Sequence, residues 1–170
     1  MRFVKLAIFS LVSIFILFTV IGLMMPSSVT VLRTQTINAS EDSVLSYISD
    51  LNKWHYWLNN DSAITQTSPN TTSHSIDSSI KYGSYEIILT GNDSNRIITL
   101  WQNNSGTELK SMMDVNHDDK NASASIVTWS FQQKLKWYPW ERLTGMLHDK
   151  ILGPSMEASL LKLKQTVEKN

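Results

Sequence analysis

An uninterrupted apolar segment near the N-terminus constrains this chain more than any other feature of its sequence. Residues 6–25, LAIFSLVSIFILFTVIGLMM, carry no charge, and only Ser10, Ser13, Thr19 and Gly22 separate the large apolar side chains. As a helix, the segment would be about 30 Å long, which matches the thickness of the hydrocarbon core of a bilayer. The segment therefore favours a membrane-spanning helix.

Two other interpretations of this segment remain open. A cleavable signal peptide usually has an apolar region of about 7–15 residues that ends in small residues. Here the run is longer, and it ends in Leu23, Met24 and Met25 before Pro26. A buried helix of a soluble protein is the second alternative. We predict an uncleaved transmembrane anchor over residues 1–25 and one further domain over residues 26–170.

The charges that flank the segment predict its orientation. Arg2 and Lys5 precede it, and the first charged residue after it is Arg33. Because positive charge is retained on the cytoplasmic side, the N-terminus should lie in the cytoplasm. We therefore expect a single-pass protein of the inner, cytoplasmic membrane, with its domain on the periplasmic or extracytoplasmic side.

Charge and composition exclude several classes of function. The chain has 15 basic and 15 acidic residues, and without Arg2 and Lys5 the balance is 13 against 15. A nucleic-acid-binding protein needs a dense basic face, so we expect no nucleic-acid partner. The chain has no cysteine, and its four histidines lack a spacing such as HExxH. No nucleotide-binding loop or GxSxG motif occurs either, so we expect no metal and no cofactor.

The residues after the apolar segment predict one strand and then two short helices. Residues 29–37, VTVLRTQTI, are rich in β-branched side chains, which favours a strand. Ser40 can cap the helix that follows, in which Val44, Ile48 and Leu51 recur at helical spacing. The aromatic stretch WHYW at residues 54–57 should form a second short helix or turn.

Four strand-like runs follow a polar region at residues 59–79, in which we expect one weak strand. The runs cover residues 82–90, 95–102, 107–115 and 122–134, with polar turns between them. Consecutive strands joined by short turns make an antiparallel meander. Large apolar residues alternate along the runs and share one face: Tyr85, Ile87, Leu89, Ile97, Trp101, Leu109, Met113, Val115, Val127, Trp129 and Phe131. A sheet with one apolar face must be covered.

The C-terminal region supplies the predicted cover. One apolar series at helical spacing consists of Trp140, Leu143, Leu147 and Ile151. Gly153–Pro154 should interrupt it, because proline suits the first turn of a new helix. A second series then consists of Met156, Leu160, Leu163 and Val167. We predict an amphipathic helix over residues 154–168 that packs on the sheet.

Both ends of the chain resemble membrane-anchored bacterial members of the SRPBCC superfamily, the START-like or polyketide cyclase/dehydrase-type domains. The opening shares a proline-led first strand, an Ile37–Asn38–Ala39 turn, and the spacing of Asp50, Trp54 and Trp57. The end shares a closing-helix pattern: Arg142, Gly153, Pro154, Glu157, Leu160, Leu163 and Lys164. The sequence departs from the family pattern at residues 80–85, which hold one glycine and no tryptophan.

This resemblance implies an α+β helix-grip fold, in which a curved antiparallel sheet wraps around a long C-terminal helix. It also implies a cavity for a hydrophobic small molecule or lipid between the sheet and that helix. Each candidate lining residue can equally be ordinary core packing. The candidates are Trp54, Trp57, Tyr85, Trp101, Met113, Trp129, Phe131, Arg142, Leu147, Met156 and Leu160.

Our preferred hypothesis is a membrane-tethered domain that binds a hydrophobic ligand and catalyses no reaction. One alternative is a cyclase- or hydratase-like enzyme, which would need a titratable group with a shifted pKa in the cavity. Another is a protein-interaction domain whose core is filled by its own side chains. The run KWYPWERL, residues 136–143, either closes the cavity or rests on the bilayer as an interfacial belt.

Overall fold

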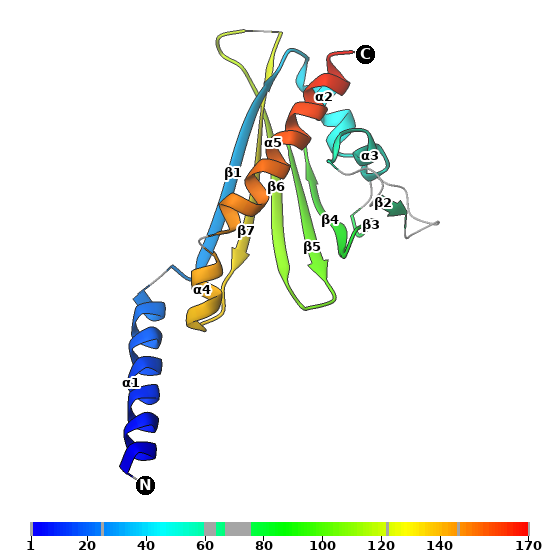
Figure 1. The fold of residues 1–170 in the computed structure, drawn as a ribbon. Coiled ribbons are helices and arrows are strands. Elements are labelled where there is room, and N and C mark those ends of the chain that lie inside the picture. The colour runs from blue at the N-terminus through cyan, green and yellow to red at the C-terminus, as the bar shows by residue number, and fades with distance from the viewer. Residues whose placement is uncertain are drawn as a thin grey trace.

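A long C-terminal helix crosses one face of an antiparallel sheet, and an apolar helix extends from one end of this unit (Figure 1). The computed structural model describes residues 2–24, 26–59, 64–66, 76–121, 123–145 and 147–169. We call the end of the sheet beside the apolar helix the base of the domain.

The sheet has seven strands in the order β1-β7-β6-β5-β4-β3-β2, and all neighbours are antiparallel. The first strand therefore pairs with the last strand of the predicted meander, in register from Ser28↔Lys134 to Ile37↔Ser125. The strand bounds are β1 Ser28–Ile37, β2 Ile64–Gln66, β3 Ser79–Tyr82, β4 Tyr85–Asp93, β5 Arg96–Asn103, β6 Glu108–His117 and β7 Ser125–Lys134.

The predicted strand at residues 82–90 was wrong at both ends. A hairpin turn separates β3 from β4, because Gly83 adopts φ +58° and lets Tyr82 pair with Tyr85. The residues 91–93 that were expected to form a turn continue β4 instead. A register shift between Leu89 and Gly91 absorbs one extra residue as a bulge, so pairing extends to Asp93↔Arg96.

The short helical elements between β1 and β2 follow the sequence prediction closely. Ser40 caps the first of them by accepting a hydrogen bond from the backbone nitrogen of Ser43, at 3.4 Å. Asp50 caps the next turn through the backbone nitrogen of Asn52, at 2.9 Å. The bounds are α1 Arg2–Met24, α2 Glu41–Ile48, η1 Leu51–Lys53, α3 Trp54–Trp57, α4 Pro139–Gly145 and α5 His148–Val167.

Helix α5 covers the sheet, as predicted. The side chains of Met156, Leu160, Leu163 and Val167 are buried in the same core as the inward residues of the strands. This confirms the helix-grip architecture and the α+β fold class. The first predicted apolar series does not pack into this core: Trp140, Leu147 and Ile151 are 59%, 49% and 66% exposed.

The expected break at Gly153–Pro154 is also absent, because α5 runs without interruption from His148 to Val167. A residue before proline is pushed away from helical geometry partly by its own Cβ atom, and Gly153 has none. The same glycine makes room for Arg33, which reaches from β1 across α5. A Cβ atom at Gly153 would lie 2.2 Å from Nη2 of Arg33.

Arg33 ties the edge strand β1 to α5. Its Nη1 lies 2.9 Å from Oδ1 of Asp149, and its Nε donates to Oε1 of Glu157 at 2.6 Å. Two hydrogen bonds raise the pKa of Arg33: the larger effect comes from Asp149 and the next from Glu157. Asp149, Gly153 and Glu157 are four residues apart, so they lie on one face of α5. Arg33 therefore bridges two carboxylates across a notch that only glycine provides.

We expect Gly153→Ala and Arg33→Ala to be non-additive. In the wild-type background, a methyl group at position 153 must displace the guanidinium and weaken both ion pairs. In the Arg33→Ala background that contact is gone, so the same substitution should cost less stability. Denaturant titrations of the four proteins would measure the coupling, and equal effects of Gly153→Ala in both backgrounds would contradict this account of Gly153.

Helix α1 stands apart from the core. It is long and apolar enough to cross a membrane, and 6% of its most apolar window is buried, which excludes a buried helix of a soluble core. A signal sequence meets the same criteria of length and composition. Three residues separate α1 from β1.

Arg142 of α4 caps the last turn of α1, because its Nη1 donates to the carbonyl oxygen of Gly22 at 2.8 Å.

Candidate ligand-binding site

Seven rings from the strands and from α3 form a continuous layer between the sheet and α5. We call it the aromatic layer; it consists of Trp54, Trp57, Tyr82, Tyr85, Trp101, Trp129 and Phe131. Trp101 lies at its centre and contacts five other rings, at centroid distances of 5.0 to 6.5 Å. These distances are those of aromatic rings that pack directly against one another.

Every indole N–H in the aromatic layer has an acceptor within the protein. Trp54 donates to the carbonyl oxygen of Ile48 at 2.9 Å, and Trp57 donates to that of Tyr47 at 3.4 Å. The other two use hydroxyl groups of the sheet: Trp101 donates to Thr99 at 3.1 Å, and Trp129 donates to Ser111 at 2.8 Å. A ligand that enters the layer would therefore contact the faces of the rings. It would find no unpaired indole N–H group.

The structure brings most of the predicted lining residues together. Met113, Met156 and Leu160 are at most 2% exposed and belong to the core that contains the aromatic layer, and Tyr85 packs against it. Arg142 and Leu147 lie elsewhere. Arg142 bonds to the end of α1, and Leu147 is half exposed at the start of α5. The sequence could not show that α4, which carries Arg142, contacts the end of α1.

Titratable groups are scarce near the aromatic layer. In the described part of the chain, Asp50 is the one buried ionisable side chain, and it serves as the cap of η1. Hydrogen bonds raise the pKa of two arginines, Arg33 through Asp149 and Arg96 through Asp114, but both lie outside the layer. The side-chain groups that bond to the indoles of the layer are the hydroxyls of Thr99 and Ser111, which are not titratable near neutral pH.

A narrow gap continues from the aromatic layer toward the base of the domain. The described residues around it are Val29, Val31, Leu109, Phe131, Gln133, His148 and Leu152, and it is too narrow to admit water. Gln133 carries a buried Oε1 atom that has no hydrogen-bond partner among the described residues. The sequence analysis missed Gln133, although it lies two residues after Phe131 and so shares the inward face of β7.

His148 is the titratable side chain at this gap, and it is half-buried. Its Nδ1 atom lies 3.2 Å from the carbonyl oxygen of Gly145. The neighbouring Asp149 points to Arg33, so the two adjacent side chains do not form an acid/base pair. This agrees with the rule that neighbouring positions on a helix face different directions.

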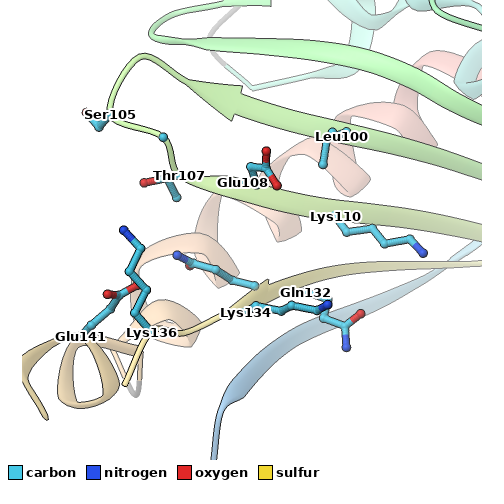
Figure 2. Close-up of a pocket in the computed structure, with 11 residues that line it drawn as sticks. Leu100, Ser105, Thr107, Glu108, Lys110, Gln132, Lys134, Lys136 and Glu141 are labelled. Atoms are coloured by element: carbon cyan, nitrogen blue, oxygen red, sulfur yellow. The ribbon is translucent and has the colours of Figure 1, made fainter. Parts of the chain in front are cut away.

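An open pocket of about 370 Å³ lies on the outer face of the sheet, where Figure 2 shows charged and polar side chains instead of rings. Leu100 and Lys110 line it, and they alternate with the inward residues Trp101 and Leu109. The remaining lining residues are Ser105, Gly106, Thr107, Glu108, Gln132, Gln133, Lys134, Lys136 and Glu141. Its lysine and glutamate side chains make it unsuited to an apolar molecule, so the candidate site is the aromatic layer with its gap.

Comparisons with known proteins agree with this geometry. The profile of a family described as "Polyketide cyclase / dehydrase and lipid transport" matches residues 28–168. No curated protein sequence matches the chain.

Three solved structures show the same fold at low sequence identity. A START superfamily protein from Mycobacterium smegmatis is 14% identical, with a TM-score of 0.63 over 83% of this chain and 98% of that one. A protein from Nitrosospira multiformis is 10% identical, with a TM-score of 0.65 over 80% and 94% of the two chains. One from Thermobifida fusca is 16% identical, with a TM-score of 0.63 over 82% and 93%.

Proposed function

Because the chain belongs to the polyketide cyclase/dehydrase and lipid transport family, we propose that it is a membrane-tethered domain that binds an apolar small molecule or lipid without transforming it. The observation that carries this proposal is the aromatic layer, whose indole N–H groups are all satisfied internally. A ligand in such a layer is recognised mainly by apolar contact, because the layer presents ring surface and its four indole N–H groups already have acceptors.

Binding requires the layer to open, because its rings touch one another. The gap at the base is the natural entrance, since it reaches Phe131 of the layer and is bounded by Leu152 of α5. Entry there would give the buried Oε1 atom of Gln133 a hydrogen-bond donor if the ligand carries a hydroxyl or amide group. The ligand class is therefore an apolar molecule with at most a small polar end.

The tether is α1, which remains attached in the working protein with its N-terminus in the cytoplasm. Arg142 supports this interpretation over a cleaved signal, because cleavage would remove the carbonyl acceptors of its guanidinium at Gly22 and Leu23. The charges of Arg2 and Lys5 support the orientation. The domain then works on the extracytoplasmic side of the inner membrane.

Native mass spectrometry of the full chain, released from mild detergent, tests the ligand. We expect a bound apolar molecule on the wild-type protein. Val29→Phe should remove it by filling the gap, whereas Leu32→Phe on the exposed side of the same strand should retain it. Wild-type protein that carries no ligand, even after incubation with extracted membrane lipids, would contradict the proposal and favour the interaction domain. A bound substrate and its dehydrated product would instead favour the enzyme.

The absence of cysteine makes the topology easy to test. Ser123→Cys places a single thiol in the exposed connection between β6 and β7, at the end of the sheet away from α1 (Figure 1). A membrane-impermeant maleimide should label this variant from the extracytoplasmic side of intact cells, and the labelled protein should stay with the membrane fraction. Labelling that requires lysis of the cytoplasmic membrane would reject the proposed orientation.

A further inference from the structure

Two of the six tryptophans are exposed, and both lie at the base of the domain. Trp137 is 52% exposed and Trp140 is 59% exposed, while the other four are buried in the aromatic layer. Tyr138 joins them: its ring is 4.8 Å from that of Trp137 and stacks parallel to that of Trp140 at 5.2 Å. We call these three residues the basal aromatic patch. Clustered exposed rings of this kind mark an interaction surface.

The patch lies where α1 ends. Trp140 belongs to α4, and Figure 1 shows α4 beside the last turn of α1. The contact is specific, because Arg142 of α4 donates to the carbonyl oxygen of Gly22, and Gly22 is the buried residue of α1. If α1 spans a bilayer, this contact holds α4 at the depth where the hydrocarbon core gives way to the headgroups.

We propose that the basal aromatic patch inserts into the headgroup region of the leaflet from which α1 emerges, as a second membrane contact. This inference rests on the proposed anchoring by α1. Tryptophan and tyrosine favour this depth because their rings are apolar and their N–H and O–H groups remain hydrated. Lys136 precedes the patch and can extend its ammonium group toward lipid phosphates.

The first turn of α5 extends the apolar surface. Leu147 and Ile151 are four residues apart, so they share one face, and they are 49% and 66% exposed. Burial in lipid would remove this surface from water, and it accounts for apolar side chains that do not pack against the sheet.

A domain held at two points has a fixed orientation to the bilayer. The gap opens at the same end of the domain as α4, because it is lined by the start of β1, the end of β7 and the start of α5. Insertion of the patch therefore turns the entrance of the candidate site toward the lipid. An apolar molecule can then move from the bilayer into the gap without crossing bulk water.

Fluorescence of the full chain in vesicles of phosphatidylcholine and phosphatidylglycerol tests the contact. Helix α1 contains no tryptophan, so brominated lipids can quench only the tryptophans of the domain. We expect bromination near the headgroups to quench the wild-type protein, and the double substitution Trp137→Phe with Trp140→Phe to abolish that quenching. Trp57→Phe makes the same change inside the aromatic layer and should leave the quenching in place.

The outcomes separate this inference from the anchor itself. If carbonate extracts the chain from the vesicles, both the proposed anchor and the proposed basal contact are refuted. A chain that stays embedded, while Trp137 and Trp140 are quenched by aqueous acrylamide and not by bromolipid, overturns only the basal contact. Protection from both quenchers, with a cross-linked dimer, assigns the patch to a second copy of the chain and likewise overturns it.

Discussion

Trp101→Ala should lower the free energy of unfolding of the domain by about 3–5 kcal/mol, the usual cost of removing a buried tryptophan from a core. Trp101 contacts five aromatic rings and is 6% exposed. The substitution removes all five contacts, opens a void at the centre of the aromatic layer and leaves the Thr99 hydroxyl without the indole N–H. Urea titration of the full chain in detergent, followed by circular dichroism, would measure the loss.

Trp137→Ala is the matched control, because it makes the same chemical change at a half-exposed position. In detergent it should change stability by about 0.5 kcal/mol or less, as surface substitutions usually do. Equal effects of the two substitutions would mean that the rings of the aromatic layer do not form a packed core.

Leu163→Ala should destabilise the domain by about 2–5 kcal/mol, because Leu163 is fully buried between α5 and the sheet. Leu161→Ala, two residues earlier on the same helix, should have an effect of about 0.5 kcal/mol or less. Leu161 is 50% exposed. Since both changes alter helix propensity equally, their difference measures the packing of α5 on the sheet. The same denaturant titration compares them, and indistinguishable midpoints would count against a closing helix held by apolar contact.

Local pattern was sufficient to predict much of this fold. Alternation along the strands assigned Trp101 and Trp129 to the inward face, and helical spacing assigned Met156 and Leu163 to the covering face of α5. These assignments hold because burial of one face is the main constraint on each element. The ring content of the candidate site could be predicted for the same reason, although Tyr82 was missed.

The errors arise where a distant contact decides the local structure. Helix α5 continues through Pro154 with the help of Gly153, and Gly153 in turn faces Arg33 on a strand far away in the sequence. Trp140 has helical spacing with the residues that follow it, but it belongs to α4, which contacts α1, and its side chain is 59% exposed. Neither contact leaves a periodic signal, so the pattern alone could not reveal them.

The connection between α1 and β1 limits how far the domain can travel. It has three residues, which span at most about 11 Å when fully extended. With α1 in the bilayer, the domain cannot carry cargo across an aqueous compartment to an opposite membrane. Under the proposed function, the domain would act only on molecules that reach it at the lipid surface, and any onward delivery would be made to a second protein at the same membrane.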